Sequence, residues 1–158
     1  MKLEFFTYII KLMEENEDIY FISAGLGWPR TDELKEKFPD RFIQTEAAEA
    51  TALDIAVGLS YAGKIPFVYT ITPFLYRGFE TIRTYINHEN LNVKLIGAGR
   101  DTDYSKHDGY SHDACDIEEI LSTQKNVRQL YPKDTEEMKR CVDTMIIHPY
   151  PYFLSLTR

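Results

Sequence analysis

Residues 47–70 read AAEATALDIAVGLSYAGKIPFVYT, and this stretch indicates the fold. Ala47–Ala62 is rich in alanine and places its larger apolar side chains on one face at helical spacing, so we expect a helix there. Gly63 follows at a position where helices commonly end. Ile65–Thr70 is a short run of β-branched and aromatic residues, which is typical of a buried strand. A helix followed at once by a buried strand predicts a parallel α/β unit.

The same alternation of helix and strand continues on both sides of that stretch. Apolar runs predict further strands at residues 19–24, 42–44, 93–98, 127–131 and 153–156, and helical spacing predicts helices at residues 5–13, 32–37, 73–88 and 138–146. Strands that alternate with helices pair in parallel through helical crossovers. We therefore predict a three-layer, doubly wound, mostly parallel sheet with helices on both faces. The length of 158 residues predicts one domain, residues 1–158.

Polar residues at three positions predict where helices begin. Thr31 precedes a short acidic-then-basic helix, and Asp116 with Glu119 resembles a capping box. Asp134 with Glu137 repeats that spacing before the last helix.

Charge and composition exclude several classes of protein. Asp and Glu number 25 against 18 Lys and Arg, so the formal net charge is -7. Nucleic acids and anionic membranes attract basic surfaces, so we expect neither as a partner. No apolar run approaches the roughly 20 residues of a membrane-spanning helix, and the first residues lack the apolar core of a secretory signal. Cys115 and Cys141 form no disulfide framework, so we expect a cytoplasmic protein.

The usual cofactor motifs fail in this sequence. Gly97–Gly99 follows a predicted strand without the third glycine of a nucleotide-binding turn, and Gly25–Gly27 fails in the same way. Both segments are expected to be simple turns. There is no Walker loop and no Gly-x-Ser-x-Gly nucleophile elbow. Any ligand should bind beyond the carboxyl ends of the strands, as ligands do in open parallel sheets.

The segment Gly99–Ala114 at that edge is a candidate functional loop, because connections in such folds usually take about two to six residues. Its chemistry leaves three interpretations open: a substrate-facing loop, a plain solvated loop, or a metal site of His107, His112, Asp113 and Cys115. The spacing matches no standard zinc pattern, and we favour the substrate-facing loop.

Three side chains at the same edge could carry chemistry. Glu49 lies in the first turn of the alanine-rich helix, where the helix dipole stabilises an acid. Alanines on both sides predict apolar surroundings, which would favour the protonated form, and such an acid can donate a hydrogen bond to a heterocyclic nitrogen. Phe74 stands at the start of the next helix and could stack on a planar ring, with Arg77 one turn later.

These residues lie in a pattern that resembles the transketolase family. Residues 39–49, PDRFIQTEAAE, are similar to the family's PDRF…AEQ segment, and residues 63–79, GKIPFVYTITPFLYRGF, are similar to GKIPFVY…TFLxRAF. NVKLIG at residues 92–97 continues the match, and DGYSH at residues 108–112 looks like DGPTH. The part resembled is the pyrimidine-binding (Pyr) domain of thiamine-diphosphate enzymes, in the transketolase and deoxyxylulose-phosphate synthase branch.

The resemblance implies a role for individual residues. In this family one acid lies against N1′ of the cofactor's aminopyrimidine and helps it remove the C2 proton of the thiazolium ring. By its place in the motif that acid is Glu49. Phe74 matches the aromatic residue that stacks on the pyrimidine, and Arg77 matches a cofactor-binding position near the pocket. Asp108 and His112 match residues that bind substrate hydroxyls and shuttle protons, so His112 joins Glu49 as a candidate catalytic residue. No residue of the chain itself is expected to bind a metal.

The sequence departs from the family's pattern at several positions. Ala50 replaces the Gln or His that usually follows the acid, Tyr110 replaces a proline of the substrate loop, and Gly25 replaces an acid found in many relatives. Arg100 stands where transketolases have a substrate histidine. An arginine there could bind a carboxylate or phosphate with two hydrogen bonds, so we expect Arg100 in the substrate site.

The family's Gly-Asp-Gly…Asn motif, which holds the metal and the diphosphate, is missing from this sequence. We therefore expect one subunit of a split transketolase, with a diphosphate-binding (PP-domain) partner subunit that completes the site for thiamine diphosphate and holds Mg²⁺ or Ca²⁺. The family's symmetry implies an α2β2 assembly. Without the partner we expect a homodimer through the helices that begin near Ala47 and Pro73. The substrate would be a phosphorylated sugar or a 2-keto acid.

Two alternatives stay open. The chain could be the same half of a thiamine-dependent 2-keto acid decarboxylase or of a deoxyxylulose-phosphate-type synthase, which would use pyruvate-type donors. A chain without catalytic function would be a self-associating remnant or the metal-binding module described above.

Overall fold

The computed structural model describes residues 1–25 and 29–158, and its strands form one parallel sheet. The strands are β1 (Ile19–Ser23), β2 (Phe42–Gln44), β3 (Ile65–Ile71), β4 (Lys94–Ala98), β5 (Arg128–Leu130) and β6 (Tyr152–Leu156). Their order is β2-β1-β3-β4-β6-β5, and every neighbouring pair in this sheet is parallel.

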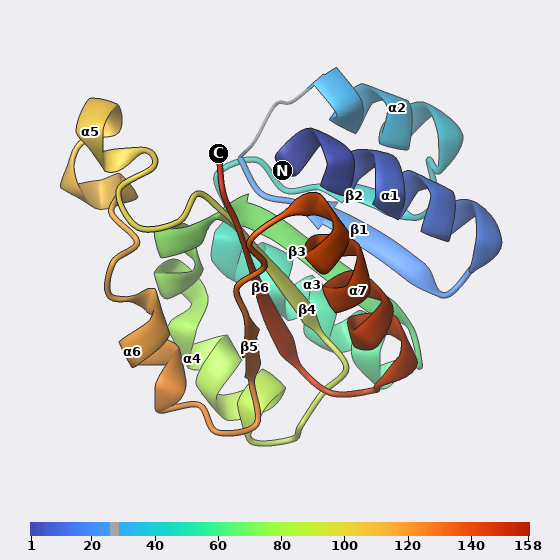
Figure 1. Cartoon of the computed structure of the whole chain (residues 1–158). Coiled ribbons are helices and arrows are strands. Elements are labelled where there is room, and N and C mark those ends of the chain that lie inside the picture. The colour runs from blue at the N-terminus through green and yellow to red at the C-terminus, as the bar shows by residue number, and fades with distance from the viewer. Residues whose placement is uncertain (26–28) are drawn as a thin grey trace.

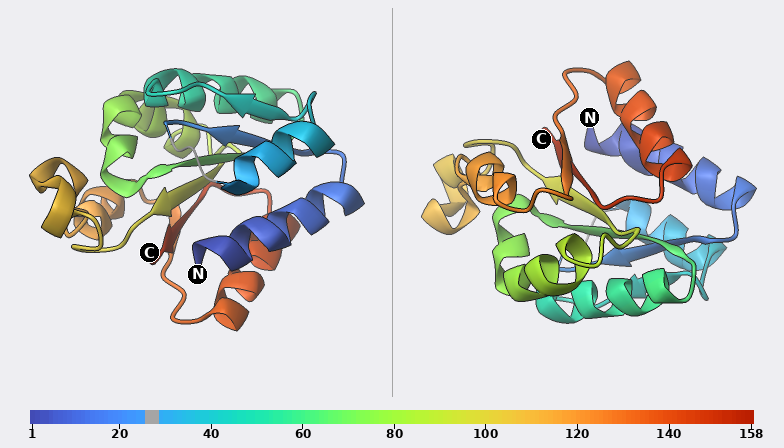
Figure 2. Two further views of the ribbon diagram at one scale, coloured as in Figure 1. Left: turned by 90° about the horizontal axis from the view of Figure 1, so that it is seen from above. Right: turned by 90° about the horizontal axis from the view of Figure 1, so that it is seen from below.

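Helices cover both faces of the sheet (Figures 1 and 2). One face packs against α1 (Lys2–Glu15), α2 (Pro29–Lys37) and α7 (Thr135–Ile147). The other packs against α3 (Glu49–Tyr61), the consecutive segments η1 (Thr72–Gly78), α4 (Phe79–Thr81) and η2 (Ile82–Asn87), and α6 (Ile117–Ser122). Two short helices, α5 (Ser105–Asp108) and η3 (Tyr110–His112), lie in the loop after β4. The predicted three-layer, doubly wound fold is confirmed.

Side chains of successive strand residues alternate between two apolar layers. Phe21 and Phe67 belong to the layer under α1 and α7, whereas Ile22 and Val68 belong to the layer under α3. All four are almost completely buried. A strand buried on both faces needs apolar residues at consecutive positions, which explains the uninterrupted apolar runs in the sequence.

The strand order places a reversal of chain direction next to β1. From β1 the chain moves outward to β2, and it then returns past β1 to β3. Right-handed crossovers require the connecting helix to change face when the direction reverses, so α2 and α3 lie on opposite faces. The segments that follow β1 and β3 therefore leave toward opposite faces of the sheet, and ligands of doubly wound folds bind at such a switch in strand order.

Most of the predicted elements are confirmed, and the differences have local causes. The segment predicted as a helix at residues 73–88 is helical but irregular, with a 3-10 turn first, then a short α-helix and a π-helical stretch. Asp134 caps α7 as predicted, because its Oδ1 accepts a hydrogen bond from the Glu137 amide at 2.8 Å.

The prediction for Thr31 is wrong, because Thr31 lies inside α2, which begins two residues earlier at Pro29. Asp116 stands at the N-cap of α6, so the predicted start of this helix is confirmed, but the predicted capping bond is not formed. Its Oδ1 accepts a hydrogen bond from the Tyr76 hydroxyl instead.

The turns and the membrane prediction can also be compared with the structure. Gly99 and Gly25 have positive φ angles of 86° and 70°, as expected for glycines in turns. Residues 26 and 27 of the second predicted turn lie outside the described residues. Within residues 1–25 and 29–158, no helix combines the length and the apolar character needed to cross a bilayer.

Candidate functional site

The candidate site is centred on Glu49, the first residue of α3. Its side chain is only 2% exposed. Oε1 accepts a hydrogen bond from the Arg77 guanidinium at 2.6 Å, and the two groups form an ion pair. Oε2 is buried and has no hydrogen-bond partner among the described residues. The carboxylate is thus half satisfied.

The ion pair corrects one expectation drawn from the sequence. The alanines around Glu49 predicted apolar surroundings, but a guanidinium lies beside the acid. Arg77 comes from a segment 28 residues away, so its approach is a property of the fold and is not visible in the neighbouring sequence.

Phe74 and Arg77 are stacked on each other one turn apart in η1. The centre of the Arg77 guanidinium lies 4.0 Å from the centroid of the Phe74 ring, which is a close cation–π contact. Arg77 therefore touches both the acid and the aromatic ring. Its side chain is 51% exposed, so this position lies at the surface end of the buried site.

The absence of a side chain at Gly78 allows this arrangement. A Cβ atom at Gly78 would lie 2.4 Å from Leu53 Cδ1 and 3.1 Å from Ala50 Cα, which is closer than such atoms normally approach. The glycine therefore lets η1 lie directly against the first turns of α3. Arg77 is brought to Glu49 by this contact.

Thr72 fixes the other end of η1 to the sheet, and Gly97 leaves the space for it. Thr72 Oγ1 donates hydrogen bonds to the carbonyl oxygens of Ala98 and Gly99 at the end of β4. A Cβ atom at Gly97 would lie 2.5 Å from Thr72 Oγ1 and 2.8 Å from Phe153 Cε2. The start of η1 is thus fixed to the sheet, and Phe74 lies two residues further on.

His112 joins the same group of side chains. Its ring meets the edge of Phe74 with centroids 5.0 Å apart and an interplanar angle of 64°, and Nδ1 lies 3.0 Å from Ser111 Oγ. A pocket of about 290 Å³ opens beside these rings. It is lined by Pro73, Phe74, Tyr76, Arg77, Tyr110, Ser111, Asp113 and Asp116.

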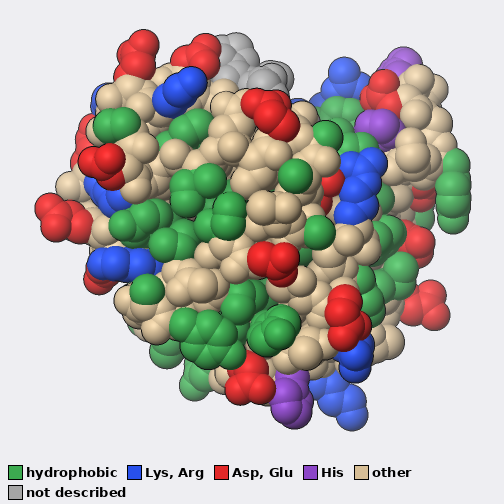
Figure 3. All heavy atoms as spheres, turned by 180° about the vertical axis from the view of Figure 1, so that it is seen from behind, with side chains coloured by type: hydrophobic (Ala, Val, Ile, Leu, Met, Phe, Trp, Pro, Cys, Tyr) green, Lys and Arg blue, Asp and Glu red, His purple; other side chains and the backbone are tan. Residues whose placement is uncertain are grey.

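Two of the predicted substrate residues lie apart from this pocket. Asp108 is exposed at the end of α5 and does not line it. Arg100 uses its guanidinium within the chain: it donates to the carbonyl oxygens of Pro132 and Ser155 and to Ser155 Oγ. Figure 3 shows the segment with α5 standing out at the upper right, with a hollow between it and the body of the molecule.

Sequence reasoning did not identify the pair Tyr76 and Asp116 in the pocket. The Tyr76 hydroxyl donates to Asp116 Oδ1 at 2.5 Å. Burial, and then the hydrogen bond with Asp116, raise the pKa of Tyr76 far above its usual value. Tyr76 lay within the family-like stretch, but only the fold shows that it meets a residue 40 positions later.

The metal-binding alternative is not supported. In the ranges 1–25 and 29–158, no three His, Cys, Asp or Glu side chains are placed to share a metal ion. Asp113 instead accepts hydrogen bonds from the Cys115 amide and from Ser105 Oγ, which hold the pKa of Asp113 below its usual value. The loop is organised by these bonds, and not by a cluster of metal ligands.

Comparison with known proteins decides the family. The family model described as "Transketolase, pyrimidine binding domain" matches residues 5–158. The chain belongs to this family. The resemblance that the motifs suggested is therefore confirmed, and the Pyr-domain fold places Glu49, Phe74 and Arg77 together at the switch in strand order.

Two known proteins match almost the whole of this chain. A protein of Methanocaldococcus jannaschii, provisionally named a transketolase C-terminal section, is 28% identical over 152 residues, which are 95% of this chain and 48% of that protein. The 1-deoxy-D-xylulose-5-phosphate synthase of Methylacidiphilum infernorum is 28% identical over 153 residues, or 95% of this chain and 24% of that protein.

A solved structure, "Split gene transketolase, inactive beta4 tetramer", superimposes with a TM-score of 0.86 and 28% identity. The superposition covers 99% of this chain and 51% of that one. The chain thus spans about half the length, or less, of the relatives that it matches.

Proposed function

We propose that this chain is the Pyr-domain subunit of a split transketolase-like enzyme that uses thiamine diphosphate. The observation that supports this most directly is the half-satisfied carboxylate of Glu49. A buried oxygen without a partner costs roughly 1–3 kcal/mol, so a ligand that bonds it gains affinity. Oε2 of Glu49 is such an atom, and it belongs to the residue that the family motif assigns to the cofactor.

The residues present fit the aminopyrimidine ring of thiamine diphosphate. When bound, this cofactor supplies a stabilised carbanion for breaking and forming bonds next to a carbonyl group. Glu49 would hold a proton between Oε2 and a ring nitrogen, in a site that excludes water. Phe74 would pack on the face of the ring, since its own ring is only partly buried.

The substrate residues are proposed from the family motif and their place in the fold. His112, on the edge of Phe74, would move protons at substrate hydroxyls. Asp108, two residues before η3, would bind a substrate hydroxyl. Arg100 would contribute positive charge at the carboxyl end of β4, toward a phosphorylated sugar or a 2-keto acid.

A partner subunit would bind the diphosphate and the metal ion. Support comes from two proteins to which the chain is similar, one named a transketolase C-terminal section and the other a split-gene transketolase. Figure 3 shows hydrophobic side chains gathered over α3 and η2, where Tyr61 and Tyr85 are 61% and 46% exposed. We propose this face for self-association, as a homodimer or within an α2β2 complex, with residues 1–158 acting as one domain.

The test is to reconstitute the chain with the diphosphate-binding section of a split transketolase, thiamine diphosphate and Mg²⁺. We expect the complex to retain the cofactor in gel filtration and to transfer a two-carbon unit from a ketose donor. Glu49→Gln should reduce turnover by at least two orders of magnitude. Glu46→Gln, at an exposed neighbouring acid, is the matched control and should leave turnover unchanged. Near-normal turnover of Glu49→Gln would contradict the assignment.

A deoxyxylulose-phosphate-type synthase is the second candidate, because a synthase of that name matches 95% of the chain. The same reconstituted complex can be given pyruvate in place of a ketose. Release of carbon dioxide from pyruvate, without transfer from the ketose, would favour the synthase.

A further inference from the structure

Arg77 lies in the space that the proposed function gives to the aminopyrimidine ring. Its guanidinium contacts Glu49 Oε1 at 2.6 Å and lies 4.0 Å from the centre of the Phe74 ring. We infer that Arg77 is a placeholder, which occupies the pyrimidine site of the free chain and must move out before the cofactor ring can bind. This inference rests on the proposed function, and it assigns Arg77 a role opposite to that of a cofactor ligand.

The chemistry of the two groups explains why one can substitute for the other. A guanidinium is planar and delocalised, carries N–H donors in its plane and stacks on aromatic faces. An aminopyrimidine that shares a proton with Glu49 is also planar, is partly cationic and donates in its plane. Both would bond the same carboxylate and stack on the same ring. One face of Phe74 cannot hold two planar groups at stacking distance.

The structure offers Arg77 a second position. Arg77 lines the 290 Å³ pocket together with the carboxylates of Asp113 and Asp116. Its side chain is half exposed, so it can rotate without disturbing the apolar core. Asp116 is exposed, and the only hydrogen bond to its side chain in the part described comes from the Tyr76 hydroxyl at Oδ1. The guanidinium can therefore exchange Glu49 for another carboxylate, and the positive charge stays paired.

As a placeholder, Arg77 would neutralise the charge of Glu49 while no cofactor is bound. A carboxylate as deeply buried as that of Glu49 would be costly without a counter-charge. Arg77 supplies that charge in the free chain. Cofactor binding then replaces one planar cation with another, and an unpaired buried acid is avoided at each stage.

The test uses the isolated chain and the aminopyrimidine alcohol that forms half of thiamine, a probe that needs no diphosphate site. Its dissociation constant would be measured by NMR titration for the wild-type chain, Arg77→Met and Arg83→Met. If Arg77 fills the site in about nine chains of ten, its removal should tighten binding about tenfold. Arg83 lies on the following helical segment and pairs with Glu80, so Arg83→Met should bind like the wild type.

A second measurement follows Arg77 itself. On saturation of the wild-type chain with the probe, the guanidinium signals of Arg77 should lose the ring-current shift caused by Phe74. Binding by Arg77→Met that is equal to or weaker than that of the wild type, or an Arg77 signal that stays in place at saturation, would overturn the inference and leave the proposed function standing. No binding by any of the three chains at millimolar probe would overturn the pyrimidine site itself, and the proposed function with it.

Discussion

At the scale of single residues, the unfolding free energy should reveal how Glu49 and Arg77 depend on each other. Arg77→Met leaves a carboxylate that is 2% exposed without its counter-charge. We expect a loss of about 1–3 kcal/mol in the free energy of unfolding at pH 7, because a buried charged group loses its partner. Urea unfolding of the isolated chain measures this loss.

The same substitution in a Glu49→Gln background separates pairing from packing. A neutral amide needs no counter-charge, so Arg77→Met should then cost much less. The Arg77 side chain is half exposed, and its packing on Phe74 contributes little on its own. An equal loss in both backgrounds would show that Arg77 stabilises the chain through the aromatic stack and not through the ion pair.

At the scale of secondary structure, the position of η1 against α3 depends on Gly78. We expect Gly78→Ala to lower the free energy of unfolding by about 1–3 kcal/mol, because the added methyl group overlaps Leu53 and approaches the α3 backbone. The displaced η1 would also separate Arg77 from Glu49. Urea unfolding reports the first effect, and the NMR shifts of the Arg77 guanidinium report the second.

Gly58, in the interior of α3, provides a matched control. A Cβ atom there meets nothing within 4 Å, and the residue is exposed. Gly58→Ala should therefore stabilise the chain by about 0.5–1 kcal/mol through better helix propensity. If both substitutions destabilised the chain to the same degree, crowding at Gly78 would not be the cause.

The elements that follow local rules were predictable, and those set by long-range contacts were not. The apolar run at residues 65–70 and the alanine-rich helix before it need only their own sequence to be recognised. Asp134 caps α7 by accepting a hydrogen bond from the amide of Glu137, only three positions later in the sequence. The irregular segment from Thr72 to Asn87 depends instead on contacts with β4 and α3, which no periodicity reveals.

The same distinction applies to the candidate site. Glu49 and Phe74 were identified because the family motifs preserve their order along the chain. The pairing of Tyr76 with Asp116 and the internal bonds of Arg100 were missed, because each joins segments that are at least 32 residues apart. When two residues are that far apart in the sequence, their spacing does not indicate how close they lie in the folded chain.

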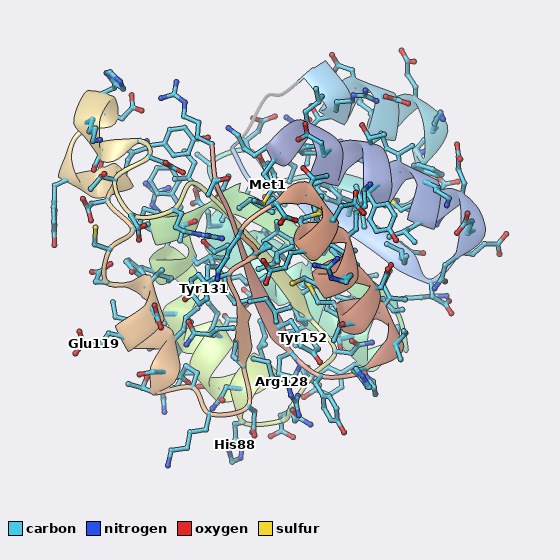
Figure 4. All side chains as sticks on the ribbon, in the orientation of Figure 1. Met1, His88, Glu119, Arg128, Tyr131 and Tyr152 are labelled. Carbon is cyan, nitrogen blue, oxygen red and sulfur yellow. The ribbon has the colours of Figure 1, made fainter. Side chains whose placement is uncertain are left out.

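At the scale of the whole molecule, charged side chains are buried at both ends of the parallel strands: Glu49 at one end and Lys94 at the other. The candidate site lies at the carboxyl ends of the strands. Lys94 lies at the opposite end of β4, fully buried, and its Nζ donates to the carbonyl oxygens of His148 and Tyr150. Figure 4 labels Tyr152 and Arg128 at this end, and the ring of Tyr152 lies 4.9 Å from Nζ.

Lys94 should make the stability of the chain depend on pH. Burial, together with the charge of Arg128, lowers the pKa of Lys94 from 10.5 to about 7. Between those values the unfolded chain holds a proton on Lys94 that the folded chain does not. Raising the pH removes this advantage of the unfolded state, so the free energy of unfolding should rise by up to about 1.4 kcal/mol per pH unit above pH 7.

Urea unfolding at pH 7 and at pH 8.5 tests this dependence. The hydrogen bond with Asp113 raises the pKa of Cys115, and burial raises the pKa of Cys141, so titration of these thiols favours the unfolded chain as the pH rises and opposes the effect of Lys94. Lys94→Met removes the titrating group and should flatten the rise over this interval. Lys64→Met is the matched control: the hydrogen bond with Asp18 raises the pKa of Lys64, so its stabilising contribution is lost only at higher pH. A rise that persisted unchanged in Lys94→Met would show that another group controls the pH dependence.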